Sequence, residues 1–462
     1  MKKIFLFLLT LLFSLSLSAK EIGPLAKEGE GCLFDSLILQ NFTSHRVTDK
    51  SSEVYFTKDG FGVGITKKGE FTLNANNKRL NFRGLSGIML YDRDNPEKLY
   101  SLELKNIDKA GFSGECRELG VTADVKVRAK DFSIGFSAEI KSEEKKKITL
   151  AFCFPADGST ALDMDKQIWI YDFGKAVECE KGKEYITPMP GNSSLSRYPF
   201  GAMMNRFVSF AIATSPLAKD SRFMFFRDLR TFANVYDLSL DKDIVAETDF
   251  EMFKYSYLWG MRGVYDRYVA LFGSYFPNKE DIKGFNLKDV DNFDISFKSL
   301  LSYDGYRVKG SLSEEDIYFI KCVAKNKPVY YMIDEENFAS EYPKAVLYGF
   351  IPEYEEPLSP ENSKIVAKLK PVYDIVQSSV WDICPQSESN NRNVISEKYY
   401  REGKSFVVSF NNSPERRVAF LELLEYNGVS SIKNLADNSD YNIKNKTVDI
   451  VFEPYGMSVF GY

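Results

Sequence analysis

The chain has 462 residues, of which 15% are aromatic, and it carries a formal net charge of −5 with both signs mixed along its length. Because no basic stripe is present, we expect no nucleic-acid partner. His45 is the only histidine. This argues against a histidine-rich zinc site, and against triad catalysis unless His45 is the base, so we expect no metal and no cofactor.

Residues 1–19 have the organisation of a secretory signal peptide. Lys2 and Lys3 give a positive start, residues 4–13 are apolar except for Thr10, and small residues then alternate with leucine up to Ala19. The apolar run is shorter than the roughly 20 residues that span a bilayer, and no later segment reaches that length. We predict cleavage after Ala19 or the residue before it, a secreted or periplasmic protein, and no stable membrane span after cleavage.

Apolar residues recur at every second position from Ser52 to about Thr248. Segments such as 121–129 and 148–154 show this alternation, and turns such as Lys58-Asp59-Gly60 separate them. Alternation of this kind places one side of each strand on a core. Many such strands between tight turns are typical of packed antiparallel sheets. We therefore predict a mainly β chain in which residues 20–276 form a large antiparallel β-supersandwich.

The period of the apolar pattern changes near Trp259. From 260 to 272 the apolar positions, Met261, Val264 and Tyr268 among them, fall on one face of a helix that ends at Pro277. Residues 278–310 are polar and weakly patterned, which indicates a linker.

The next part of the chain has α/β character. Ser313 and Asp316 form a capping box that starts a helix, and a strand follows over residues 329–333. A second helix begins near Pro360, a residue favoured in the first helical turn. We expect Pro371 to interrupt this helix.

Two-residue periodicity returns at Lys404 and continues to the end of the chain. We predict a small C-terminal β-sandwich over residues 396–462. Residues 277–395, before it, are predicted to be a linker and a reduced α/β segment.

An oxidising compartment permits disulfides between the six cysteines of the chain. Six cysteines allow 15 pairings, and the sequence does not choose among them. Cys153 lies in an apolar run, where the simplest interpretation is a buried small hydrophobe. The cysteines are Cys32, Cys116, Cys153, Cys179, Cys322 and Cys384.

Several short motifs follow one another in the order found in a known family. They are Arg197-Tyr198-Pro199-Phe200, Trp259-Gly260-Met261-Arg262, Tyr275-Phe276-Pro277, Lys327-Pro328-Val329-Tyr330-Tyr331, Leu347-Tyr348-Gly349-Phe350 and Glu453-Pro454-Tyr455-Gly456. From about residue 50 onward the chain resembles bacterial glycoside-hydrolase-like proteins. The resemblance implies an N-terminal mutarotase-like β-supersandwich, a central α/β barrel and a C-terminal β-sandwich.

The central part of the chain departs from that pattern because it is short. A complete barrel of eight βα units needs roughly 200 residues or more, whereas only about 120 lie between Pro277 and the C-terminal strands. Two or three α/β units fit into this length. We therefore expect a truncated barrel that has lost most positions at which such enzymes carry catalytic carboxylates.

Glycoside hydrolysis requires two carboxylates, one acting as the acid and the other as a base or nucleophile. The candidates are Asp334 and Glu336, just after a strand, and Glu353, after a strand-like segment. In barrels such positions form the active site. The alternative interpretation is a solvated acidic loop. Further acids of the same two segments are Glu335, Glu355 and Glu356.

Sugar binding does not require the pair of carboxylates that hydrolysis requires. Aromatic faces stack on sugar rings, and charged side chains bond to the hydroxyls. Candidates with this chemistry are Arg197, Tyr198, Trp259, Arg262 and Trp381. The alternative interpretation is that they pack in a core or at a domain interface.

We therefore expect an exported protein, related to glycoside hydrolases, that binds poly- or oligosaccharide or is otherwise associated with carbohydrate, without efficient catalysis. Two alternatives stay open. One is a glycoside hydrolase that uses a carboxylate pair within residues 334–356. The other is a structural cell-surface protein that has no sugar site.

Overall fold

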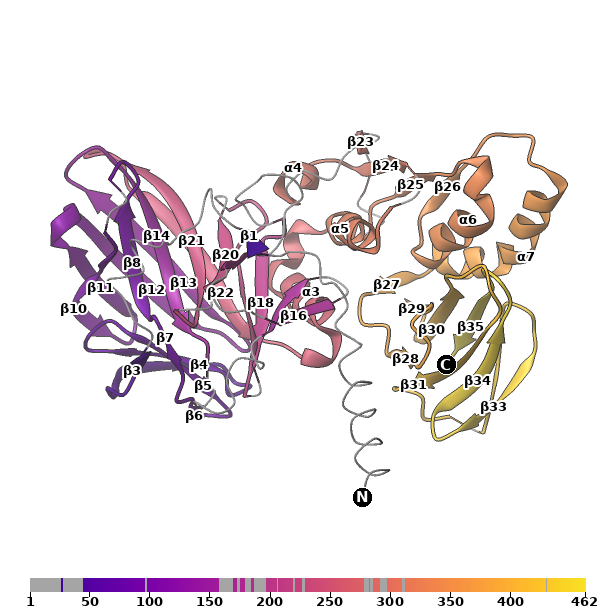
Figure 1. The fold of residues 1–462 in the computed structure, drawn as a ribbon, viewed down its shortest axis with the longest axis horizontal. Coiled ribbons are helices and arrows are strands. Elements are labelled where there is room, and N and C mark those ends of the chain that lie inside the picture. The colour runs from indigo at the N-terminus through magenta and orange to yellow at the C-terminus, as the bar shows by residue number, and fades with distance from the viewer. Residues whose placement is uncertain are drawn as a thin grey trace, which may run out of the picture.

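The computed structural model describes residues 26–27, 45–95, 98–157, 169–172, 175–178, 184–186, 197–205, 207–218, 221–226, 229–277, 282, 286–290, 297–309, 312–428 and 430–462. The predicted signal peptide, Cys32 and Cys179 lie outside the described residues. The chain is mainly β, as predicted, with large antiparallel sheets and a few helices (Figure 1).

The N-terminal half consists of antiparallel sheets. A seven-stranded sheet has the order β1 (Ala26–Lys27), β17 (Glu184–Ile186), β20 (Arg222–Phe226), β21 (Thr231–Leu240), β14 (Lys146–Pro155), β8 (Gly87–Asp92) and β9 (Tyr100–Ser101). A nine-stranded sheet has the order β10 (Glu103–Asp108), β11 (Gly111–Cys116), β12 (Val121–Ala129), β13 (Ile134–Ser142), β22 (Ala246–Lys254), β19 (Ser209–Ala213), β18 (Phe200–Met204), β15 (Trp169–Asp172) and β16 (Lys175–Glu178). The short 3-10 helix η1 (Arg117–Leu119) joins β11 to β12.

Two smaller sheets complete this half of the molecule. A four-stranded sheet contains β3 (Ser51–Phe56), β4 (Gly62–Thr66), β5 (Phe71–Ala75) and β6 (Lys78–Arg79), and a two-stranded sheet pairs β2 (His45–Arg46) with β7 (Arg83–Gly84).

The alternation predicted from the sequence sets which side of each strand is buried. Val121, Ala123, Val125 and Val127 on β12 point into the core, while the residues that alternate with them are exposed. Strand β14 differs because it is central in its sheet, between β8 and β21, and from Ile148 to its end it is buried on both faces. Cys153 on this strand is fully buried, which confirms its interpretation as a small core residue.

Helix α3 (Met261–Phe272) follows β22 through the 3-10 helix η2 (Tyr257–Trp259) and ends in η3 (Gly273–Tyr275). Its buried face contains Met261, Val264 and Tyr268, as the helical period predicts.

The central segment is a parallel sheet in the order β23-β24-β25-β26, flanked by helices, within the described residues. Its elements in chain order are β23 (Leu287–Val290), α4 (Phe297–Leu301), β24 (Gly305–Lys309), α5 (Glu314–Ala324), β25 (Val329–Met332), η5 (Glu335–Asn337), α6 (Phe338–Leu347), β26 (Ile351–Glu353) and α7 (Pro360–Gln377). The capping box is confirmed, since the Ser313 hydroxyl accepts a hydrogen bond from the Asp316 amide at 3.1 Å.

Several predictions for this central segment were wrong. Residues 278–310 are not only a linker, because they contain β23, α4 and β24. Four short βα units are therefore present in the described residues instead of two or three. Helix α7 continues through Pro371 without interruption, and α6 was not predicted at all.

The C-terminal part consists of two antiparallel sheets. One has the order β27 (Val380–Asp382), β29 (Val394–Arg401), β30 (Lys404–Asn411) and β35 (Met457–Gly461), and the other has the order β28 (Ser387–Ser389), β31 (Arg417–Leu423), β34 (Thr447–Phe452), β33 (Asp440–Lys444) and β32 (Ser431–Lys433). These sheets begin at Val380, earlier than residue 396, where the sequence suggested that the C-terminal sandwich starts.

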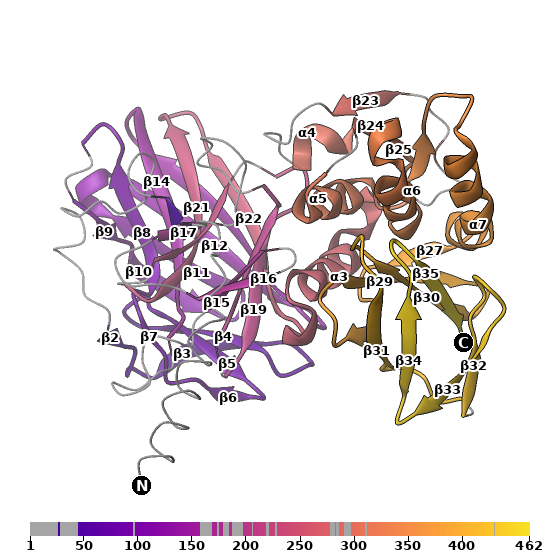
Figure 2. The same cartoon turned by 45° about the vertical axis from the view of Figure 1, so that its right-hand side comes forward.

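One hydrophobic core connects the three parts of the chain. It contains Phe200 of β18, Tyr268 of α3, Phe319 of α5 and Phe406 of β30. In Figure 2, α3 and α5 lie between the N-terminal sheets and the C-terminal sandwich. The described cysteines, 116, 153, 322 and 384, are buried free thiols. None of the described helices is long and apolar enough to cross a membrane.

Candidate functional site

The parallel sheet has one buried face and one solvent-exposed face. On β24 and β25, the side chains of Tyr306, Val308 and Tyr331 are buried in the core. Arg307 and Met332, which alternate with them, are 40% and 39% exposed. Since successive side chains of a strand point to opposite faces, the helices and core cover one face of the sheet and the other meets solvent.

Ion pairs connect strands on the solvent-exposed face of this sheet. Arg307 Nε lies 3.0 Å from Glu353 Oε2 on β26, and an Arg307 amino group lies 3.8 Å from Asp289 Oδ1 on β23. In a closed barrel the corresponding face is a packed interior filled by layers of apolar side chains. The described strands therefore form an open sheet with a polar surface.

A pocket of about 570 Å³ opens where β25 and β26 end. Aromatic rings form part of its wall, because Phe338 and Tyr354 stand edge to face with ring centroids 5.3 Å apart. Among its described lining residues there is no basic side chain. The acidic lining residues are Asp334, Glu335, Glu353, Glu355 and Glu356. We call this site the acidic pocket.

Two of the three predicted catalytic residues line the acidic pocket. Met332 and Glu353 are paired across the parallel strands, and the Ile333 amide donates to the Glu353 carbonyl at 2.8 Å. Asp334 follows directly and precedes η5. The structure thus brings Asp334 and Glu353 from neighbouring strand ends to one cavity, whereas Glu336 is not among its lining residues.

The aromatic walls of this pocket were missed by the sequence reasoning. Tyr354 lies between the acids Glu353 and Glu355 in the sequence. An aromatic residue between two acids was the sequence feature from which this part of the pocket wall could have been predicted. Phe338 begins α6, a helix that was not predicted, so its position next to Tyr354 was not foreseeable.

The predicted sugar ligands Arg197 and Tyr198 are buried. Each is 1% exposed. The Arg197 guanidinium donates to Asp316 at 2.7 Å and to Glu315 at 3.4 Å, and it lies 4.0 Å from the centre of the Phe319 ring. This pair therefore connects the start of β18 to α5 and offers no face to a sugar.

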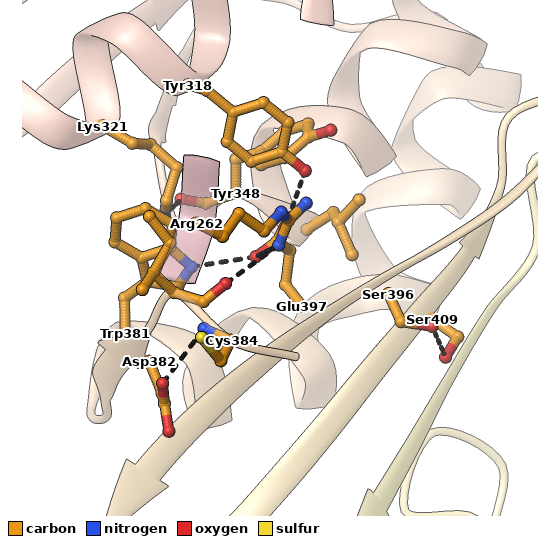
Figure 3. Close-up of polar contacts among 12 residues, drawn as sticks. Arg262, Tyr318, Lys321, Tyr348, Trp381, Asp382, Cys384, Ser396, Glu397 and Ser409 are labelled. Carbon is orange, nitrogen blue, oxygen red and sulfur yellow. Dashed lines mark hydrogen bonds and ion pairs between the residues drawn. The ribbon is translucent and has the colours of Figure 1, made fainter. Parts of the chain in front are cut away.

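Arg262 and Trp381 are buried around a single carboxylate, Glu397 of β29, which is fully buried (Figure 3). Arg262 approaches the two oxygens of Glu397 with two nitrogens at 3.0 and 3.2 Å. The Trp381 indole donates to the same carboxylate at 2.9 Å and the Tyr318 hydroxyl at 2.8 Å. We call these four residues the Glu397 cluster.

The Glu397 cluster joins α3, α5, β27 and β29, and so connects all three parts of the chain. Trp259, at the end of η2, is partly buried and packs against the same core. Three of the five predicted sugar ligands, Arg197, Tyr198 and Trp381, are thus buried, and the guanidinium of Arg262, whose side chain is 13% exposed, is occupied by Glu397, which corrects the interpretation that these four bind a sugar. Aromatic rings beside arginines serve here as packing between elements.

A buried lysine lies next to the Glu397 cluster. The Lys321 ammonium donates to the Tyr348 carbonyl and lies 4.1 Å from the centre of the Trp381 ring and 5.6 Å from that of Tyr399. Burial lowers the pKa of Lys321 to about 7, although the nearby Glu397 carboxylate acts to raise it.

His45 lies on β2, where it is 55% exposed and its Nε2 is 2.6 Å from Glu70 Oε1. In the part of the chain that the structure describes, no group of three or more His, Cys, Asp or Glu side chains is placed to hold a metal ion.

Comparison with solved structures found a glycoside-hydrolase-like fold. The structure of a variant of GH36 alpha-galactosidase AgaA from Geobacillus stearothermophilus, in complex with 1-deoxygalactonojirimycin, is similar with a TM-score of 0.51 and 8% identity, over 91% of this chain and 99% of that chain. A second AgaA variant, in complex with stachyose, has a TM-score of 0.50 and 8% identity over 89% of this chain and 99% of that chain.

A beta-arabinopyranosidase has a TM-score of 0.41 at 10% identity, over 89% of this chain and 100% of that chain. No protein-family model and no curated protein matches the sequence. At such low identities the likeness concerns the fold.

Proposed function

We propose that this chain is an exported protein that binds oligo- or polysaccharide in the acidic pocket, without efficient hydrolysis. One observation carries the proposal that hydrolysis is inefficient. It is the solvent-exposed face of the parallel sheet, where Arg307 forms ion pairs with Glu353 and Asp289.

The dimensions and chemistry of the acidic pocket support binding. Its volume of about 570 Å³ is in the usual range for small-ligand sites. The partly exposed ring of Tyr354 provides apolar surface for the C–H face of a sugar ring, and the buried ring of Phe338 packs against it and holds it in place. Carboxylates such as Asp334 accept hydrogen bonds from sugar hydroxyls, and such charge-assisted bonds are stronger than neutral ones.

The open sheet argues against efficient catalysis. Barrel enzymes collect catalytic residues from several strand ends around a closed, packed interior. Here the described carboxylates of the pocket come only from the segment after β25 and from the end of β26 with the residues that follow it. Glu353 is also engaged by Arg307 at 3.0 Å, and the strands that the structure describes in this segment do not close into a barrel that would exclude water from this edge.

A glycoside hydrolase is the second candidate. It is favoured by the fold shared with AgaA and by the position of Asp334 and Glu353 at the carboxyl ends of adjacent parallel strands. In this candidate one of the two is the acid, and the other is the base or nucleophile. Glu336, in η5, is not among the lining residues of the pocket and so is not paired with Glu353 in this candidate. A structural surface protein is the third candidate and predicts no sugar binding.

Calorimetric titration of the chain lacking residues 1–19 tests the proposal. The probes are stachyose, as found with AgaA, and neutral gluco-, xylo- and manno-oligosaccharides. We expect binding of at least one probe, weakened roughly tenfold by Tyr354→Ala, the loss expected when an aromatic platform is removed. Tyr400→Ala, on a tyrosine that is 49% exposed on β29, is the matched control and leaves binding unchanged. No binding of any probe would refute the proposal.

A further inference from the structure

A second pocket, of about 720 Å³, lies on the N-terminal sheets, away from the strand ends that form the acidic pocket. Three segments form it: the turn between β5 and β6 with Asn76, the loop between β18 and β19 with Phe207, and the end of β22 with Lys254 together with the start of η2 with Tyr257. We call it the aromatic pocket.

Two large rings of the aromatic pocket are open to water. Tyr257 is 67% exposed and Phe207 is 44% exposed. Phe207 packs against Phe82, with ring centroids 5.9 Å apart. Burying an aromatic ring is favourable by a few kcal/mol, so two exposed rings beside one concavity mark a surface suited to a ligand.

The loop that carries Phe207 is held in place by a buried amide. The Asn205 side chain accepts hydrogen bonds from the Phe207 and Val208 amides at 2.9 and 3.1 Å, and it donates to the Ala156 carbonyl at 2.8 Å. The ring is therefore pre-positioned, which reduces the entropy lost when a ligand binds.

The charge of the aromatic pocket differs from that of the acidic pocket. Among its described lining residues there is no acid, and Lys254 is the charged side chain. The Lys254 ammonium donates to the Asp59 carbonyl and lies 3.8 Å from the Asp59 carboxylate, which orients it, and because an ammonium has three N–H donors it can bond to a further acceptor as well. The Asn76 amide is exposed at the rim.

We propose that the aromatic pocket is a second carbohydrate site and that it takes a sugar ring carrying a carboxylate, that is, a uronate residue of an acidic oligosaccharide. Tyr257 and Phe207 contact the apolar face of the ring. Lys254 binds the carboxylate, and Asn76 bonds to hydroxyls. The five acids of the acidic pocket repel the same ligand, so the two pockets select sugars of different charge. This inference does not depend on sugar binding in the acidic pocket.

Hydrogen–deuterium exchange of the chain lacking residues 1–19 separates the two sites in one experiment. The probes are tri-galacturonate, an acidic oligosaccharide, and stachyose, a neutral one. We expect tri-galacturonate to slow exchange in peptides spanning 207–213 and 254–260, and not in peptides spanning 332–338 and 353–358. Protection of the last two peptides by stachyose reports separately on the acidic pocket.

Variants test the individual side chains. Tyr257→Ala and Lys254→Met are each expected to weaken tri-galacturonate binding roughly tenfold. Lys254→Arg retains the charge and most of the affinity. Tyr257 is largely exposed, so its removal should not change the unfolding midpoint, and Tyr400→Ala is the matched control. The inference is overturned if tri-galacturonate protects neither of the first two peptides, or if only the neutral probe protects them.

Discussion

Arg262 of α3 and Glu397 of β29 form a bidentate ion pair in the interior of the protein, with nitrogen–oxygen distances of 3.0 and 3.2 Å. Glu397 is fully buried and receives two further hydrogen bonds, from Trp381 and Tyr318. These donors satisfy a carboxylate that would otherwise be costly to bury. Residues 135 positions apart in the chain are thereby fixed to one another.

Removing the charge of Glu397 should destabilise the protein. In Glu397→Gln the Arg262 guanidinium is left buried with a neutral partner, and breaking a buried pair in this way costs about 3–5 kcal/mol. Urea unfolding followed by circular dichroism measures the loss. Glu388→Gln, at an exposed position on β28, is the control and should change stability by less than about 0.5 kcal/mol. Equal effects of the two substitutions would contradict the role given to the cluster.

Lys321 should make stability depend on pH. Its pKa falls from the model-peptide value of 10.5 to about 7 in the folded chain because burial disfavours the ammonium. Between these values the unfolded chain binds more protons than the folded chain, so this lysine makes stability rise with pH. Below about pH 7 both states are protonated and its contribution is constant.

Lys321→Met should therefore flatten the rise in the urea midpoint between about pH 7 and about pH 9. Lys370→Met, which removes an ammonium that is 68% exposed on α7, is the control and should leave the slope unchanged. An unchanged slope in Lys321→Met would show that the buried amine does not titrate in this window.

Arg307 should matter more for binding than for stability. Its side chain is 40% exposed and Glu353 is 34% exposed, and exposed pairs contribute about 0–1 kcal/mol. Arg307→Gln should thus shift the unfolding free energy by less than about 1 kcal/mol. It should weaken sugar binding in the acidic pocket several-fold, because Glu353 loses the partner that orients it. Lys309→Gln, on the same strand at an exposed position, is the control.

Export should depend on the apolar run of residues 4–13. Leu8→Arg places a charge in the middle of that run, so the full-length chain should remain in the cytoplasm. The unaltered chain should be recovered outside the cytoplasm with Lys20, or Ala19, as its first residue, as N-terminal sequencing would show. Recovery of an uncleaved chain in the exported fraction would contradict the signal-peptide prediction.

The extended strands were predictable because burial of one face leaves a regular mark on the sequence. Val121 to Ala129 is such a strand, and Ser313 with Asp316 gives an equally local signal for α5. Strands β23 and β26 are only a few residues long and mostly half-exposed, so they leave little alternation to detect. The prediction that Pro371 interrupts the helix was also wrong, since α7 continues through this residue.

The site residues were harder to predict for a different reason. Arg262 and Trp381 have the same chemistry whether they face a sugar or a buried carboxylate, and their partner Glu397 is distant in sequence. Asp334 and Glu353 were found because strand ends in α/β segments gather polar groups at one edge. Their shared pocket depends on β25 and β26 being neighbours, which the fold decides.

Saturation-transfer difference NMR with an oligosaccharide that binds, followed over a day in the same tube, tests the central proposal most directly. It reports contact between sugar and protein through the transferred signal, and cleavage through new anomeric protons. The account predicts transfer that Tyr354→Ala reduces, and a sugar that stays intact. Cleavage by the unaltered chain that disappears in Glu353→Gln would contradict it.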